Sequence, residues 1–482
     1  MQSRYGAPIL ALLGLAVALS FLGSHGLFEP TEGRYAEVSR EMLESGNFLE
    51  PTVGYHPHWT KPPLTYWGAA AGMAMFGRNA WGARLFGALA FVFTVLAVAG
   101  TATRLWDRRS GFVAGLVYLS ALFPVLAAAL LTTDTLLTLW VTLAMFAFVA
   151  AWRGDSARAG GWWIRAMWLC FGLGFFTKGP PALLPLLVVI VFAAGARRLG
   201  RLWDVLGVAA FLVVGLWWYA AVSLRNPGLL DYFLRDEIVG RNLTDEFHRN
   251  PQWYGPLVVY LPPLLVGLGP WLTEAVRGAR RAVRLRDQEP LWGAAESARR
   301  LLLLWIAIPL VVLSVSKSRL PLYVLPLIAP IALATASAAR RSGKRRIVAL
   351  SVASVVLCVA AKSSIPLFDR HNNARLIHDA AVAAGGPDAR YAFLDERYLY
   401  GVQFYFDGRI ERVFTSVPPG QPDTTRNLDT VLSDFVASTD ARPLVFVTHT
   451  AGANAVESAI RDLNGRASRS QFEGREIVVV SK

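Results

Sequence analysis

The chain has 482 residues, of which 54% are hydrophobic and 17% charged, and its mean hydropathy is +0.39. A soluble protein carries about a quarter charged residues, so this composition excludes an ordinary soluble enzyme. The net charge of +14 comes largely from arginine-rich loops between apolar segments. Such loops indicate membrane topology and contact with anionic lipid, so no nucleic-acid partner is expected. Both cysteines fall inside apolar runs, which predicts no disulfide.

Apolar runs of roughly 17–25 residues recur along the chain, the length that crosses about 30 Å of hydrocarbon. We therefore predict a polytopic α-helical membrane protein with about 11–13 transmembrane helices, always an odd number. The predicted spans are 7–27, 82–103, 111–129, 133–152, 163–178, 180–196, 203–223, 254–276, 300–316, 319–338 and 346–362. Arg4 places the N-terminus inside, so the loops 28–81 and 224–253 and the tail 363–482 lie outside the membrane.

Beyond residue 362 the long apolar runs give way to short elements of mixed polarity. Helical periodicity covers 375–384, 398–406 and 454–463, and strand-like runs cover 390–394, 443–448 and 476–480. A segment of about a hundred residues can bury a core of its own. We therefore predict a transmembrane domain over 1–362 and a small extracytoplasmic α/β domain over 363–482.

The first outer loop, 28–81, concentrates carboxylates, basic groups and aromatic rings directly after the first apolar span. From Glu37 onward the charges follow the wet face of an amphipathic helix, which is expected to lie in the membrane interface. That pattern does not explain Thr31-Glu32-Gly33-Arg34-Tyr35, which precede it. Polar groups gathered beside a bilayer without such a reason indicate a functional site.

Lys61 is followed by Pro62 and Pro63, which hold the backbone in an extended form. A rigid lysine between Trp59 and Tyr66 suits a phosphate, because its ammonium group is a compact point charge. The alternative is an aromatic belt at the membrane interface with a snorkelling lysine. That alternative explains the tryptophan but not the paired prolines.

Asp134 lies between two apolar stretches with no counter-charge nearby in sequence. A lone carboxylate at a helix centre costs about 2.5–3.5 kcal/mol, so we expect Asp134 at the outer end of its span, close to Glu32. The two carboxylates would act as a base or hold a divalent cation; no other cofactor is expected. The alternative for Asp134 is a helix N-cap. A zinc site built from His56, His58 and His248 is a weaker possibility.

Two further cationic positions lie at the predicted outer ends of apolar segments. Lys178 precedes Gly179 and two prolines, and a turn from Lys317 through Arg319 leads to Tyr323. Each lysine alone could snorkel to the interface. Several cations from distant parts of the sequence on one face indicate instead a bound phosphate or pyrophosphate.

At these residues the chain resembles the GT-C glycosyltransferases that use polyprenyl-phosphate sugars. The resemblance is to bacterial aminoarabinose (lipid A) transferases and protein O-mannosyltransferases, and it covers most of the membrane part. The motifs that carry it are Arg34-Tyr35-Ala36-Glu37, Arg40-Glu41-Met42, Lys61-Pro62, Thr177-Lys178-Gly179, His248-Arg249, Trp253-Tyr254 and Lys317-Ser318-Arg319-Leu320-Pro321-Leu322-Tyr323. Thr31 departs from the family, which usually has aspartate there, and Glu237 stands where a histidine is often found.

The resemblance implies an inverting transferase that moves a sugar from undecaprenyl phosphate to an extracytoplasmic acceptor. Aminoarabinose and lipid A are the expected sugar and acceptor, with other surface glycans or a protein as alternative acceptors, and the enzyme is expected to be a monomer in the inner membrane. The expected roles are catalysis by Glu32 and Asp134, donor-phosphate binding by Arg34, Lys61, Lys178, Lys317, Arg319 and Tyr323, and substrate contact by Tyr35, Tyr66, Glu237 and His248. A transporter of lipid-linked sugars is the alternative, although transporters place charges near the midplane and show repeated halves.

Overall fold

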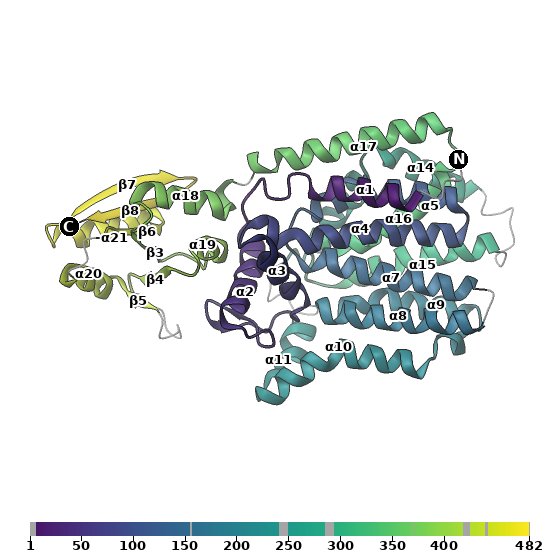
Figure 1. Cartoon of the computed structure of the whole chain (residues 1–482), viewed down its shortest axis with the longest axis horizontal. Helices are drawn as coiled ribbons and strands as arrows, with labels where there is room; N and C mark the ends of the chain where they lie inside the picture. The colour runs from purple at the N-terminus through teal and green to yellow at the C-terminus, as the bar shows by residue number, and fades with distance from the viewer. Residues whose placement is uncertain are drawn as a thin grey trace.

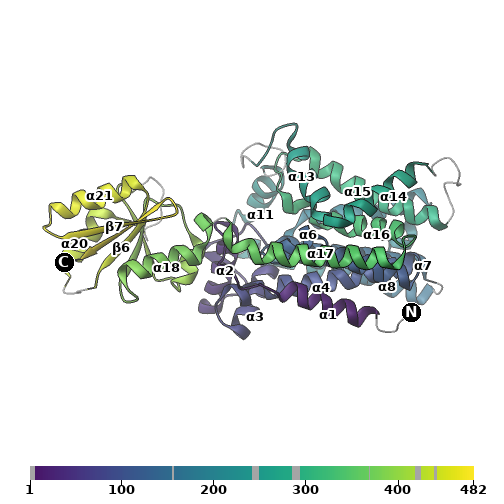
Figure 2. The same cartoon turned by 90° about the horizontal axis from the view of Figure 1, so that it is seen from above.

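The computed structural model describes residues 6–154, 157–240, 249–284, 294–368, 370–417, 425–438 and 442–481. A bundle of long apolar helices forms one part of the molecule, and a six-stranded sheet with its own helices forms the other (Figure 1). The last apolar helix, α17 (Lys344–Ser364), runs along the bundle and leads the chain to the sheet (Figure 2). The first outer loop lies between the two parts.

The bundle helices occur close to the spans that hydropathy predicts. They are α1 (Gly6–Leu19), α4 (Ala80–Leu105), α5 (Arg108–Leu119), α6 (Leu122–Ala127), α7 (Thr133–Arg153), α8 (Ala157–Lys178), α9 (Leu184–Gly195), α10 (Val205–Arg225), α13 (Gly255–Leu265), α14 (Leu272–Arg284), α15 (Ala294–Val315), α16 (Ile328–Ala339) and α17. Within the described residues, seven helical segments are long and apolar enough to cross a membrane. The chain is therefore a multi-pass membrane protein.

Several predicted spans are interrupted, mostly where proline removes a backbone donor. The span predicted over 254–276 divides into α13, a 3₁₀ segment η4 (Val266–Trp271) and α14, with prolines at 262, 263 and 270. The span over 319–338 begins as η5 (Pro321–Leu327), and the span over 180–196 begins as η1 (Pro180–Leu183). Two of these breaks, η1 and η5, contribute residues to the lining of the cavity described below.

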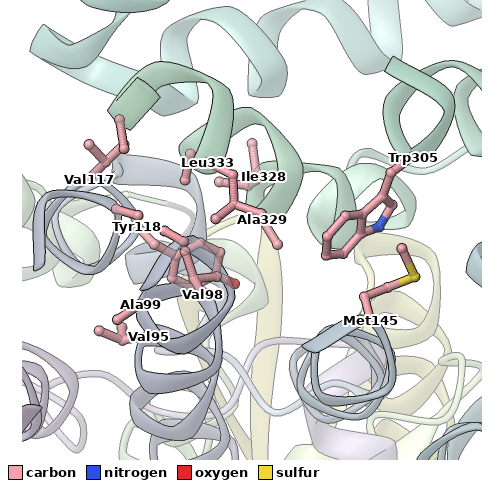
Figure 3. Packing of buried hydrophobic residues seen from close by; sticks show 14 of the residues in the cluster. Val95, Val98, Ala99, Val117, Tyr118, Met145, Trp305, Ile328, Ala329 and Leu333 are labelled. Atoms are coloured by element: carbon pink, nitrogen blue, oxygen red, sulfur yellow. The ribbon is translucent and has the colours of Figure 1, made fainter. Parts of the chain in front are cut away.

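Small and β-branched residues let the bundle helices approach closely. Figure 3 shows side chains of α4, α5 and α16 meeting in one cluster, with α7 and α15 beside it. The labelled members are Val95, Val98, Ala99, Val117, Tyr118, Met145, Trp305, Ile328, Ala329 and Leu333. This core fixes α7, which carries Asp134, against the rest of the bundle.

The first outer loop folds into α2 (Thr31–Ser45), a short antiparallel hairpin of β1 (Thr52–Val53) and β2 (His56–Pro57), and α3 (Leu64–Phe76). The expectation of a wet interfacial face on α2 is wrong, since Glu37, Arg40 and Glu41 are all buried. Arg40 and Glu37 form a bidentate ion pair at 2.8 Å, and Glu41 accepts from Thr52 at 2.6 Å. Glu37 and Arg40 are therefore paired inside the protein, and Glu41 is hydrogen-bonded there.

The C-terminal part is a sheet covered by helices on both faces. Its strands are β3 (Arg390–Leu394), β4 (Ile410–Phe414), β5 (Arg426–Asn427), β6 (Leu444–Thr448), β7 (Arg466–Phe472) and β8 (Arg475–Ser481), in the order β5-β4-β3-β6-β8-β7. The first four are parallel, and β8 runs antiparallel to β6 and β7. Helices α18 (Ala374–Gly385) and α19 (Tyr400–Tyr405) pack with one hydrophobic cluster, and α20 (Leu428–Ala437) and α21 (Thr450–Arg461) with another.

The sheet part joins the first outer loop through a close contact between α2 and α19, which are neighbours in Figure 1. A carboxylate oxygen of Glu29 accepts hydrogen bonds from the backbone of Gly401 at 2.5 Å and Val402 at 3.1 Å. Gly33 is so near that a Cβ there would collide with the Gly401 amide. Arg78 adds an ion pair to Asp407 at 2.6 Å. We call this α2–α19 contact, with Glu29, the joint.

Candidate active site

A cavity of about 270 Å³ opens at the end of the bundle that carries the outer loops. Most of its wall is apolar and comes from helices of the bundle. These apolar residues include Leu137, Val141, Phe175, Leu184, Leu216, Trp305, Leu313 and Leu327. Its polar lining includes Lys61, Asp134, Lys178, Glu237 and Tyr323. The cavity therefore combines an oily wall with a small set of charged groups, which is the composition of a site for an amphiphile.

The first charged pair joins the ends of two neighbouring helices, α7 and α8. Lys178, the last residue of α8, donates to Asp134 in the first turn of α7 at 2.5 Å, and both side chains are nearly buried. The same ammonium group lies 4.5 Å from the ring centre of Tyr323. The counter-charge that Asp134 lacks in sequence thus comes from Lys178, and pairing offsets the cost of burying either charge.

The second pair joins the first and second outer loops. Lys61 donates to Glu237 at 3.0 Å and to the carbonyl of its neighbour Thr60 at 2.6 Å. Glu237 lies on η3 (Phe233–Gly240), which follows α11 (Leu229–Tyr232). The structure thus brings together a predicted phosphate ligand and a predicted substrate residue that are far apart in sequence.

Two tyrosines of the first outer loop lie beside these pairs. The rings of Tyr35 and Tyr66 are 5.3 Å apart, and the Tyr35 hydroxyl is close to the charges of Lys178 and Asp134. Burial raises the pKa of both tyrosines, so each keeps its proton at neutral pH. Both hydroxyls are therefore neutral donors at the edge of the site, where the sequence predicts substrate contact.

Glu32 does not form the expected pair with Asp134. Arg84, a fully buried residue of α4, donates to both carboxylate oxygens of Glu32 at 2.8 Å. The same carboxylate accepts from the backbone of Leu131 at 2.6 Å and Phe28 at 3.1 Å. Glu32 thus ties the first outer loop to α4 and to the segment before α7, which places Asp134. Arg84 was not predicted as a site residue, because the sequence does not show which acid an arginine inside an apolar span will pair with.

Glu32 and Asp134 are not arranged to bind a divalent cation, which was one of the two roles expected for them. Each of the two candidate carboxylates is already neutralised by a basic side chain of the protein, Arg84 for Glu32 and Lys178 for Asp134. Among the residues that the structure describes, no group of three or more histidines, cysteines or acids could hold a metal. His248, the third residue of the zinc hypothesis and a predicted substrate contact, lies outside the described residues.

The turn before Tyr323 holds the second outer loop. Arg319 is buried and donates to the carbonyls of Asn250 at 2.7 Å, Gln252 at 2.8 Å and Ser314 at 2.9 Å. Its guanidinium group therefore clamps the second outer loop in place, and neither Arg319 nor the exposed Lys317 lines the cavity. The clamped loop brings Arg249 to 3.5 Å from the Tyr323 hydroxyl. Only the His248-Arg249 motif pointed to that arginine.

Arg34 lies outside the cavity lining as well. It is half-buried in the first turn of α2, with its guanidinium carbon 6.0 Å from the ring centre of Tyr35. Its guanidinium group makes no hydrogen bond or ion pair with the residues that the structure describes. Burial, together with the charges of Arg34 and Lys61, lowers the pKa of His58 to about 3 and keeps that imidazole neutral. Thr31 is exposed at the start of the same helix.

Comparison with known sequences identifies relatives over most of the chain. A family model described as dolichyl-phosphate-mannose-protein mannosyltransferase matches residues 60–219. The undecaprenyl phosphate-alpha-4-amino-4-deoxy-L-arabinose arabinosyl transferase of Edwardsiella ictaluri is 32% identical over 399 residues, which cover 78% of this chain and 70% of that protein. Transferase 2 of Pseudomonas fluorescens Pf0-1 is 33% identical over 339 residues, 69% of this chain but only 59% of the relative.

Solved structures share the fold at lower sequence identity. The crystal structure of ArnT from Cupriavidus metallidurans bound to undecaprenyl phosphate superposes with a TM-score of 0.78 at 22% identity, covering 99% of this chain and 98% of that one. An oligosaccharyltransferase from Archaeoglobus fulgidus superposes with a TM-score of 0.52 at 12% identity, covering 86% of this chain and 64% of that one. The helix bundle and the C-terminal sheet part therefore form a known architecture.

Proposed function

The chain belongs to the family of undecaprenyl phosphate-alpha-4-amino-4-deoxy-L-arabinose arabinosyl transferases, and on this basis we propose that it transfers aminoarabinose from undecaprenyl phosphate to lipid A. The chain covers 59% of the length of the Pseudomonas relative, so the proposal also needs support from its own site. That support is the shape and chemistry of the cavity.

The observation that carries the proposal is an apolar cavity whose lining holds two lysines, each paired with a carboxylate. A polyprenyl chain needs an oily wall, and its phosphate needs cations that no longer face bulk water. Lys61 and Lys178 are both within the cavity lining, and each is held ready by a carboxylate, Glu237 and Asp134 respectively. Tyr323 lies against the second lysine and can donate to the same phosphate.

The positive charges of Lys61 and Lys178 suit a reaction in which a phosphate leaves the sugar. An acceptor oxygen forms a bond to the anomeric carbon of the sugar while the bond from that carbon to the donor phosphate breaks, with inversion. The electron pair leaves with the phosphate oxygen, and Lys61 and Lys178 stabilise the developing negative charge. If the acceptor atom is an ionised phosphate oxygen of lipid A, no proton has to be removed. Asp134 then acts by holding Lys178 in position, and no separate base is required.

We further propose that this site faces the periplasm from the bacterial inner membrane, with the sheet part over 363–482 as an extracytoplasmic domain and 1–362 as the membrane domain. Support comes from the placement of charge. Helix α1 begins at the end of the bundle opposite the sheet (Figure 1). Short arginine-rich loops favour the cytoplasmic side. A periplasmic enzyme has no nucleotide sugars at hand, so it needs a donor activated by a lipid phosphate.

The test is transfer by the purified full chain in detergent, with undecaprenyl-phosphate-linked aminoarabinose, lipid A and mass spectrometry of the product. We expect one added aminoarabinose per turnover, which a transporter would not give. Lys61→Ala should lower kcat/KM about 10²–10³-fold, by analogy with loss of one oxyanion donor. Lys344→Ala is the matched control, because that lysine is exposed at the start of α17, away from the cavity. Equal activity of the two variants would contradict the proposal.

A further inference from the structure

The charges in the lining of the cavity are balanced. Among the described residues that line it, two are lysines, Lys61 and Lys178, and two are acids, Asp134 and Glu237. A site for the phosphate of a lipid alone would be served best by an excess of positive charge. A balanced lining suits a ligand with one charge of each sign, because each charge that leaves water needs a partner. The balance therefore points to a ligand that carries a positive group beside its phosphate.

The two ion pairs of the lining differ in how readily they can separate. Asp134 and Lys178 lie at the ends of two packed helices, with 2.5 Å between their charged atoms, and both side chains are nearly buried. Glu237 lies on η3 of the second outer loop, 3.0 Å from Lys61, and its side chain is one methylene longer than that of Asp134. Lys61 also donates to the carbonyl of Thr60 at 2.6 Å, so it keeps a partner when Glu237 turns away. Glu237 is therefore the acid that a ligand can recruit.

The donor of the proposed reaction carries both charges. Its phosphate is a diester with one negative charge, and the 4-amino group of its sugar is an alkyl amine, which is protonated at neutral pH as lysine is. When the phosphate takes Lys61, Glu237 loses its counter-charge while its side chain is only 14% exposed. A carboxylate left without a partner in such surroundings is costly. The ammonium group of the same ligand supplies the missing charge.

We propose that Glu237 determines the sugar specificity of the site by binding the ammonium group of an amino sugar, while Lys61 and Lys178 bind the phosphate. The inference rests on the proposed function, because it assigns a residue to the sugar of the same donor. One ion pair of the empty site is exchanged for two ion pairs with the donor. The hydroxyl of Tyr232 donates to the other carboxylate oxygen of Glu237 at 3.3 Å and orients it. Glu237 therefore selects an amine over a hydroxyl at the same carbon of the sugar.

Kinetics with two donors test the inference on the purified full chain in nanodiscs. The donors are undecaprenyl phosphate-linked aminoarabinose and its analogue with a hydroxyl in place of the amine. We expect the wild-type chain to prefer the aminated donor about tenfold or more in kcat/KM, the effect of one hydrogen bond between charged groups. Glu237→Gln should reduce this preference to within about twofold. Glu237→Asp keeps the charge and should retain part of it.

Glu50→Gln is the matched control for the loss of an acid. Glu50 belongs to the first outer loop, its side chain is 30% exposed, and it does not line the cavity. We expect this variant to keep the wild-type preference for the aminated donor. If it loses the preference as Glu237→Gln does, the selection depends on the overall charge of the outer loops, and the inference is wrong.

Direct binding of the lipids without acceptor tests the inference apart from turnover. The wild-type chain should bind the aminated donor more tightly than its hydroxyl analogue, and Glu237→Gln should bind the two alike. Undecaprenyl phosphate without a sugar has no amine, so its binding should not weaken in Glu237→Gln. If these differences are found but no sugar is transferred, the proposed function fails and the inference stands.

Two results would overturn the inference and leave sugar transfer intact. A Glu237→Gln variant that loses the same factor with both donors would show that this acid only positions Lys61. Equal binding of the aminated donor and its hydroxyl analogue by the wild-type chain would show that the site does not recognise the amine. The second result needs no variant, so the inference can be tested even if Glu237→Gln does not fold.

Discussion

Lys61 and Lys178 each form an ion pair with a carboxylate. The side chains of Lys61 and Glu237 are 13% and 14% exposed, and those of Lys178 and Asp134 are 9% and 8% exposed. An isolated ammonium group in such surroundings would be costly, so the acids offset that cost and orient both lysines before the donor arrives. The same acids compete with the donor phosphate for the lysines. The empty site is therefore stabilised at some expense of donor affinity.

This competition predicts that Glu237→Gln binds undecaprenyl phosphate, the donor lipid without its sugar, more tightly. Glutamine keeps the size of the side chain and one acceptor oxygen, but it removes the negative charge 3.0 Å from Lys61. A partly exposed pair contributes up to about 1 kcal/mol, so the dissociation constant for undecaprenyl phosphate should fall about threefold to fivefold. Titration of the lipid into nanodiscs measures it. Glu473→Gln, an acid in the sheet part, is the control, and weaker binding by Glu237→Gln would contradict the argument.

At the scale of elements, the joint depends on two glycines. A Cβ on Gly33 would collide with the amide nitrogen of Gly401, and a Cβ on Gly401 would lie 2.7 Å from the Cβ of Ala374. Only glycine at both positions lets α2 and α19 approach this closely. The contact holds the sheet part against the helix that carries Arg34 and Tyr35, so it also positions the site.

Gly33→Ala should therefore destabilise the chain, although alanine normally favours a helix over glycine by about 1 kcal/mol. Overpacking of this kind costs about 1–3 kcal/mol, and here it acts on the joint. Thermal melting and limited proteolysis should show a lower melting temperature and earlier cleavage between the bundle and the sheet part. Gly87→Ala is the control, because a Cβ there meets only the Leu130 carbonyl at 3.9 Å. Equal melting of both variants would argue against a tight joint.

The helices of the bundle could be predicted because hydropathy is a property of each segment alone. The strands over 390–394 and 444–448 were predictable for the same reason, since they are short buried runs. Strand β7 was not predictable in this way, because its residues are mostly exposed and polar at the edge of the sheet. The same limit applies to α2, whose charged face is buried by tertiary contacts, which include those of Thr52 and Tyr55 with Glu41 and Arg40.

The sequence predicted only some members of the candidate site, and it did not predict their pairing. Lys61, Lys178, Asp134 and Tyr323 do meet at one cavity. Which carboxylate serves which cation depends on tertiary distance: Asp134 pairs with Lys178, and Glu32 with Arg84, 52 residues away. The periodicity of a single sequence does not show which distant residues form a pair.

At the scale of the whole molecule, the joint couples the sheet part to the loop that surrounds the site. Glu29 lies at its centre and is only 8% exposed. The charged groups that act on it are Arg475 from β8, which favours the carboxylate, and Glu37 from α2, which opposes it. Burial dominates and raises the pKa of Glu29 from 4.5 to about 8. The docking of the two parts should therefore depend on pH.

The direction of the pH dependence follows from the linkage between folding and proton binding at Glu29. Between pH 4.5 and about 8 the folded chain holds a proton on Glu29 that the unfolded chain has lost, so stability falls as pH rises and levels off above that window. The slope is at most about 1.4 kcal/mol per pH unit. Glu29→Gln keeps an oxygen for Gly401 and Val402 but cannot titrate, so its melting temperature should vary less from pH 5.5 to 8.5. Glu44→Gln, on the exposed side of α2, should keep the wild-type slope. Hydrogen exchange of α19, corrected for intrinsic rates, locates the effect, and an unchanged slope in Glu29→Gln would place the titrating group elsewhere.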